Sequence, residues 1–225
     1  MIERRLPLRN ITLAAKLWGD PGLPPLLAVH GWLDNAASFD RLAPLLIDHH
    51  VVAVDLAGHG RSDHHAPGNW YAYVDYLGDI AEVIAHFGWS RVDLLGHSLG
   101  ATLASVFASV HPQQVGQLLL VEGLGPLSSP AERTLDSLRR ALEARADLDG
   151  DRLRVFASIE AAVEARCRSG AISAGAARGI VERGITALKH PVEGEGCDGF
   201  RWSSDPRLTL PSAWRLSESQ IAPII

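Results

Sequence analysis

The sequence Gly-His-Ser-Leu-Gly at residues 96–100 constrains the fold of this chain more than any other feature. It stands between an apolar run at 92–95, typical of a buried strand, and a run of helical character at 101–110. A serine on so sharp a strand-to-helix turn has a strained backbone, and side chains beside it would collide with the strand and the helix. The two glycines remove those side chains. We therefore expect Ser98 to project its hydroxyl from the turn, with the first N–H groups of the helix directed toward nearby negative charge.

Strands and helices are predicted to alternate around this turn. Short apolar runs indicate strands buried on both faces at 25–29, 50–56 and 115–121 as well as 92–95. Helical periodicity or capping predicts helices between them at 38–47, with Ser38 as the cap, and at 70–87 and 101–110. Residues 4–8 and 11–18 are expected to form an antiparallel pair that opens the chain. Such alternation predicts an α/β fold with a mostly parallel sheet and helices on both faces, and functional groups at the carboxyl ends of the strands.

The character of the chain changes after about residue 125. Helices without intervening strands are predicted at 131–146, 159–168 (capped by Ser158) and 174–184, and 187–211 is expected to be irregular. A short helix at 215–220 and the first residues of a buried strand at 222–225 follow. We therefore divide the chain into a core at 1–125, a helical lid at 126–214 and an incomplete C-terminal core segment at 215–225.

Composition excludes several classes of function. The formal net charge of −5 disfavours nucleic acid as a partner. Cys167 and Cys197 form neither a disulfide framework nor a zinc motif, and no other metal-ligand spacing occurs. Residues 194–199 match G-x-G-x-x-G but follow no predicted strand, so no cofactor is expected. Neither a signal peptide nor an apolar run long enough for a bilayer is found, which predicts a cytoplasmic protein without membrane association.

Three motifs at predicted strand ends together resemble the α/β-hydrolase superfamily. They are His30-Gly31-Trp32 after the third strand, Asp-Leu-Ala-Gly-His-Gly-Arg-Ser at 55–62 after the fourth, and the sequence at 96–100 after the fifth. The resemblance covers residues 6 to about 126 and is closest to the serine-hydrolase-like branch. It implies an α/β-hydrolase sheet with a helical lid insertion, and hydrolysis of a carboxylic ester or similar small-molecule acyl substrate through an acyl-enzyme.

The resemblance also assigns roles to residues around the turn. Ser98 is implied to be the nucleophile, and the backbone N–H groups of Leu99 and Trp32 are implied to form the oxyanion hole. An aspartate occupies the position of Ser98 in related families that open epoxides or remove halide, so those reactions are disfavoured.

The pocket and the catalytic acid involve four further residues. His30 and Gly31 are expected to shape the oxyanion loop, and His97 is expected to line the pocket rather than to act as the base. Glu122 follows the strand after the nucleophile, where some members of the superfamily carry the catalytic acid. The alternative is that Glu122 is an ordinary surface carboxylate at a strand end.

One departure from the family pattern affects the expected activity. The family places its catalytic histidine on the loop after the last strand, and no residue of this chain matches it. We therefore expect a C-terminally truncated fold and a poor catalyst. A non-catalytic binding protein or inactive fragment, and a hydrolase of thioesters or carbon–carbon bonds, remain alternatives. The oligomeric state stays open.

Overall fold

A six-stranded sheet forms the centre of the protein in the computed structural model, which describes residues 1–148, 153–170, 172–189 and 197–225. The strand order is β1-β2-β4-β3-β5-β6. Its first two strands are antiparallel to each other, β2 is antiparallel to β4, and the remaining pairs are parallel. The predicted α/β class with a mostly parallel sheet is therefore confirmed. The strands are β1 (Ile2–Pro7), β2 (Thr12–Trp18), β3 (Pro25–Val29), β4 (His50–Val54), β5 (Val92–His97) and β6 (Val115–Val121).

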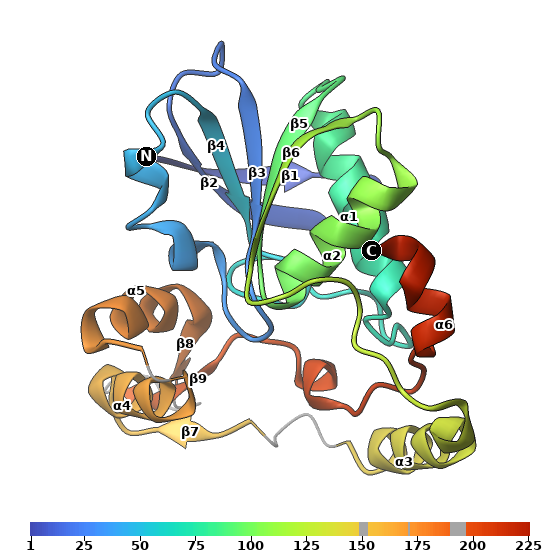
Figure 1. Ribbon diagram of the computed structural model, residues 1–225. Helices are drawn as coiled ribbons and strands as arrows, with labels where there is room; N and C mark the ends of the chain where they lie inside the picture. The colour runs from blue at the N-terminus through green and yellow to red at the C-terminus, as the bar shows by residue number, and fades with distance from the viewer. Residues whose placement is uncertain (149–152, 171, 190–196) are drawn as a thin grey trace.

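The two faces of the sheet are covered differently. On one face, α1 (Tyr73–His86) and α2 (Leu99–Val110) bury apolar side chains against the strands, and Figure 1 shows the two helices side by side. The other face packs on two short 3₁₀ turns, η1 (Ala36–Phe39) and η2 (Ala43–Leu45). Since β3 and β4 are covered on both sides, their sequences are apolar without alternation.

The helix predicted at 38–47 is wrong. Asn35, rather than Ser38, caps the first 3₁₀ turn, because its side chain accepts a hydrogen bond from the Ala37 N–H at 3.1 Å. Pro44 lacks the N–H that a continuous helix would use, so the segment breaks into two turns. Ser38 Oγ is buried and has no hydrogen-bond partner among the described residues.

After β6 the structure contains the predicted helices but also strands that were not predicted. The helices are α3 (Thr134–Ala146), α4 (Ile159–Gly170) and α5 (Ala174–Gly184), and Ser158 Oγ accepts the Ala161 N–H of α4 at 3.1 Å as expected. The prediction of no strands here, with an irregular stretch at 187–211, is wrong. An antiparallel sheet of order β7-β9-β8 is built from β7 (Val155–Phe156), β8 (Ile185–Lys189) and β9 (Cys197–Trp202).

We call the described residues between 155 and 202 the outer layer. Figure 1 shows α4, α5 and the small sheet grouped beyond one end of the main sheet, with α3 apart from them. The layer has its own apolar core, which includes Phe156, Val163 and Val181. The proposed boundaries at 125 and 214 stay predictions.

The last residues of the chain pack on α2 instead of forming a strand. The predicted short helix is present as α6 (Glu218–Ile221), but residues 222–225 form a 3₁₀ turn, η6 (Ala222–Ile224), so the strand predicted there is wrong. Ser109 Oγ donates to the Ile224 carbonyl at 2.5 Å, which ties the turn to the helix.

Two further features concern earlier expectations. No helix in the described part of the chain is long and apolar enough to cross a membrane. The first half of the glycine-rich motif, residues 194–196, lies outside the described residues, and residues 197–199 belong to β9.

Candidate active site

Ser98 lies on the turn between β5 and α2 with a strained backbone. Its φ and ψ are 51° and −113°, a conformation that residues with a side chain rarely adopt. Such strain persists only where the surrounding structure holds it, and it is frequent at functional sites. Ser98 N donates to the Val121 carbonyl at 2.8 Å and the Ser98 carbonyl accepts from Thr102 N at 3.1 Å, so both sides of the turn are fixed.

Two glycines make this turn possible. A Cβ on Gly96 would lie 2.4 Å from the Gly100 carbonyl oxygen, and a Cβ on Gly100 would lie 2.0 Å from the Val29 carbonyl oxygen. Both positions therefore exclude any side chain, because each would overlap backbone that cannot move independently. The steric requirement expected from the sequence is met by the contact between α2 and the end of β3.

The loop after β3 packs directly against Ser98. A Cβ on Gly31 would lie 3.3 Å from Ser98 Cβ, and Gly100 N donates to the His30 carbonyl at 3.1 Å. Leu99 occupies the first position of α2, where the N–H has no intrahelical acceptor. The Trp32 indole Nε1 donates to the Leu208 carbonyl at 3.0 Å, which ties the loop after β3 to the segment that follows β9.

His97 and Glu122 form a pair beside Ser98. His97 Nε2 lies 3.5 Å from Glu122 Oε2, and the Glu122 side chain is 80% exposed. Glu122 follows β6 with a φ of 54°, which turns the chain away from the sheet end. Of the histidines in the described residues, His97 alone lines the cavity beside Ser98. The role of Glu122 as a catalytic acid stays a prediction.

His30 lies beneath the site rather than in it. Its ring is fully buried and does not line the cavity, although Gly31 and Trp32 do. Nδ1 donates to the Gly31 carbonyl at 2.7 Å and Nε2 accepts from Leu56 N at 2.9 Å, an assignment that fixes the neutral tautomer. Burial lowers the pKa of His30 to about 4. The ring therefore lies where it can support the loop from below, and the predicted role of His30 in shaping the oxyanion loop stays a prediction.

A cavity of about 1080 Å³ opens above Ser98 between the main sheet and the outer layer. Gly31, Trp32, His97, Ser98 and Glu122 line its floor, whereas residues of α4, α5 and β9 line its opposite side. Residues of α3 do not take part in the described lining, so only the later part of the predicted lid faces the site.

An ion pair joins the floor of the cavity to the outer layer. Arg166 of α4 donates from Nη2 and Nε to Asp34 Oδ1 at 2.6 and 3.1 Å. Both side chains are largely buried and both line the cavity. The sequence analysis singled out neither residue, because neither belongs to a recognisable motif and the two are far apart along the chain.

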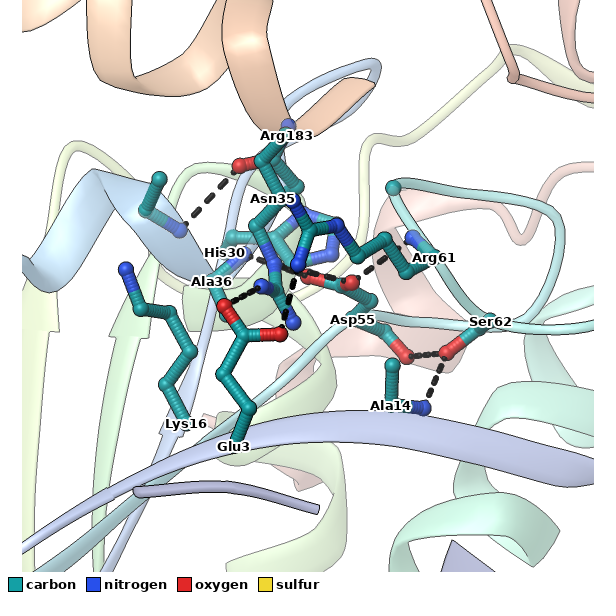
Figure 2. Close-up of polar contacts among 12 residues, drawn as sticks. Glu3, Ala14, Lys16, His30, Asn35, Ala36, Asp55, Arg61, Ser62 and Arg183 are labelled. Atoms are coloured by element: carbon teal, nitrogen blue, oxygen red, sulfur yellow. Dashed lines mark hydrogen bonds and ion pairs between the residues drawn. The ribbon is translucent and has the colours of Figure 1, made fainter. Parts of the chain in front are cut away.

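A second buried cluster, drawn in Figure 2, attaches α5 to the sheet. Asp55, at the end of β4, is fully buried and accepts from Ala36 N at 2.7 Å and from Arg61 N at 2.8 Å. Arg183 Nε donates to both Asp55 oxygens, and Arg183 Nη1 donates to Glu3 Oε1 at 2.9 Å. Asp55 belonged to a motif used for the family resemblance, but its partner on α5 was not predicted.

Known proteins resemble this chain in both sequence and structure. The family model for the alpha/beta hydrolase fold matches residues 24–155. A human serine hydrolase-like protein is 43% identical over 136 residues, which are 58% of this chain and 66% of that protein. A Dictyostelium discoideum serine hydrolase-like protein is 29% identical over 216 residues, 94% of this chain and 59% of its own length.

Two solved structures extend the comparison across the chain. A hypothetical protein from Pseudomonas aeruginosa PAO1 is 42% identical with a TM-score of 0.92, covering 99% of this chain and 77% of its own. A thioesterase domain from the curacin biosynthetic pathway is 27% identical with a TM-score of 0.82, covering 98% and 76%. The chain spans no more than two thirds of the two curated relatives described above. With its matching sheet, strand order and motifs, the chain belongs to the α/β-hydrolase fold family.

Proposed function

We propose that this protein is a serine hydrolase that cleaves a carboxylic ester, or a thioester by the same chemistry, through an acyl-enzyme on Ser98. The observation that carries the proposal is the position of Ser98, on a strained turn that opens into a large cavity and lies against the Gly31 loop. The serine hydrolase-like relatives and the thioesterase domain support this class of reaction.

The proposed first step forms a bond between Ser98 Oγ and the carbonyl carbon of the substrate. The carbonyl electron pair moves to its oxygen, and the serine proton leaves to a base. Collapse of this tetrahedral species expels the alcohol or thiol, which takes up a proton, and leaves an acylated Ser98. A water molecule then repeats the sequence, so that the carboxylic acid is released and the serine hydroxyl is restored.

The backbone N–H groups of Leu99 and Trp32 are proposed to stabilise the negative oxygen. The Leu99 N–H lies at the start of α2, where the helix dipole also favours negative charge. One such donor typically contributes about 3 kcal/mol to stabilising the transition state. The outer layer is proposed to act as the lid that excludes water from this step.

The proposed mechanism needs a general base that takes the proton of Ser98. His97, the last residue of β5, is paired with Glu122 and is proposed to line the pocket rather than to act as the base. We therefore expect slow turnover by the 225-residue chain. In comparable triads, loss of the histidine lowers turnover by roughly a millionfold.

The test combines labelling and turnover. A fluorophosphonate probe should label Ser98 slowly, over hours, in the 225-residue chain, and Ser98→Ala should abolish the label. Slow hydrolysis of p-nitrophenyl esters should fall further in the same variant. Equal labelling and equal ester hydrolysis in both proteins would remove Ser98 from the mechanism.

A non-catalytic binding protein on the same fold is the second candidate. Of the described residues, His97 is the only histidine in the cavity lining, and it is paired with Glu122, which favours this candidate. Tight binding of carboxylic acids without any Ser98-dependent label would support this candidate over the hydrolase.

A further inference from the structure

The cavity above Ser98 is much larger than a short acyl group requires. Pockets that enclose drug-sized ligands measure about 300–1,000 Å³, so a volume of about 1080 Å³ lies slightly above that range. Its walls carry large apolar side chains from both the core and the outer layer, namely Leu42, Leu95, Phe39, Phe156, Ile180 and Trp202. An acetyl group would leave most of this volume unfilled.

Gly179 enlarges the cavity at a cost to the helix. It lies inside α5, where glycine is about 1 kcal/mol less favourable than alanine. Its φ is not positive, and a Cβ there would lie 3.7 Å from Asp40 Oδ2 and 3.9 Å from Ala37 Cβ, which are ordinary contacts. Neither backbone conformation nor close packing therefore demands glycine at this position. The effect of the missing side chain is open space in the cavity wall.

Gly175 lies one helical turn before Gly179 and faces the same cavity. A Cβ on Gly175 would meet no atom within 4 Å. Neither glycine places a side chain in the cavity along this face of α5.

We propose that the acyl group accepted at Ser98 is a long, largely apolar chain, and that Gly179 and Gly175 set the length that fits. The proposal rests on the function proposed above and defines its substrate class. Each methylene buried contributes about 0.8 kcal/mol, which corresponds to about fourfold in affinity. Affinity should therefore rise with chain length until the cavity is filled.

The first experiment measures binding and does not depend on catalysis. Straight-chain carboxylate anions with four to twelve carbons, which are product analogues, are titrated into the 225-residue chain by calorimetry. Affinity should rise by about fourfold per methylene and then level off. In Gly179→Leu the side chain occupies the room of about four carbons, so the plateau should come at correspondingly shorter chains, with the four-carbon acid unaffected.

Three variants keep this experiment interpretable. Gly179→Ala should fold, since its Cβ meets only ordinary contacts. Its affinity should level off at a carboxylate about one carbon shorter than in the parent protein. In Gly175→Leu the affinity should also level off at shorter carboxylates, and the new side chain should enter open space without a packing conflict. Gly78→Leu is the matched control, because Gly78 is also inside a helix, and a Cβ added there would meet no atom within 4 Å, but it lies on α1 outside the cavity. This control should bind the whole series like the parent protein.

The outcomes separate this inference from the proposed function. If affinity rises with chain length and levels off at a shorter chain in Gly179→Leu, but no ester is hydrolysed, the result would support the inference and contradict the proposed hydrolase function. Ester hydrolysis that depends on Ser98 but not on chain length would overturn the inference alone. Loss of long-chain binding in Gly78→Leu to the same extent as in Gly179→Leu would also overturn it.

Discussion

Arg183 and Asp55, 128 positions apart in the sequence, meet in a buried ion pair in which Arg183 Nε lies 2.9 and 3.0 Å from the two Asp55 oxygens. Arg183 belongs to α5, which forms one wall of the cavity, and Asp55 ends β4 in the sheet. The pair therefore fixes the wall that faces Ser98 relative to the strand ends. Glu3 and the Arg61 N–H complete the cluster, so one buried cation meets two carboxylates (Figure 2).

Asp55→Asn should destabilise the protein by about 3–5 kcal/mol, because it leaves the buried guanidinium of Arg183 without its nearest counter-charge. Urea unfolding at pH 7 measures the change. Asp136→Asn is the control, since Asp136 pairs with Arg139 on the exposed surface of α3 and should contribute less than about 1 kcal/mol. Similar losses in both variants would contradict a structural role for the buried pair.

Stability should fall as the pH is lowered from 7.5 to 5, because His30 and His59 are buried in the neutral form. Burial lowers their pKa values to about 4 and about 3, below the value of about 6.5 expected in the unfolded chain. Between the folded and unfolded pKa values the unfolded state binds more protons than the folded state. The contribution of the two histidines to stability is therefore fully present above about pH 6.5 and decreases as the pH falls below that value. His30 alone should account for about 2 kcal/mol at pH 5.

Urea unfolding at several pH values tests this dependence. His59→Phe removes one of the two buried titrating groups and should give a shallower loss toward pH 5. A His59→Phe protein with the parent slope would contradict the assignment.

Ser98→Gly should be more stable than Ser98→Ala by about 1 kcal/mol. The positive φ of residue 98 strains any residue with a Cβ, whereas glycine adopts it freely, and the greater chain entropy of unfolded glycine offsets part of the gain. Thermal unfolding of the two variants side by side measures the difference. Equal midpoints would mean that the turn stores no strain in solution.

Gly100→Ala should destabilise the protein by about 3 kcal/mol or more, because its Cβ would overlap the Val29 carbonyl oxygen. The matched control is Gly78→Ala, where the added methyl group meets open space and the helix should gain up to about 1 kcal/mol. Both values come from chemical denaturation. If Gly100→Ala is as stable as the parent, α2 can move away from β3 at little cost. That result would contradict the conclusion that these two elements are closely packed.

We predict that this chain self-associates at high concentration through β6 and that Leu119→Lys reduces the association. Leu119 lies on β6, an edge of the main sheet, where Leu118 and Val121 are also partly exposed. Exposed strand edges with apolar side chains favour intermolecular pairing, and a lysine opposes it. Sedimentation velocity over a range of concentrations measures the effect. Leu135→Lys, at an exposed position of α3, is the control and should leave association unchanged.

The core strands were predicted because their signals are local. Residues 25–29 and 115–121 form strands with the predicted bounds, and α5 spans residues 174–184 as expected. Prediction failed where short-range signals were ambiguous. Pro44 divided the expected helix, and residues 222–225 are apolar enough for a strand but turn onto α2. A single proline decided the conformation of the first segment, and packing on α2 decided that of the second.

The turn at Ser98 could be read from residues 92–100 alone, because its signals are local: a short, mostly apolar strand, two glycines around the serine and a helical run after them. The tertiary structure decided what faces that serine. The small outer sheet, the Asp34–Arg166 pair and the cavity beside Gly179 all depend on residues far apart in the chain. Their contacts arise from packing of whole elements, and neither residue spacing nor periodicity encodes which distant side chains will meet.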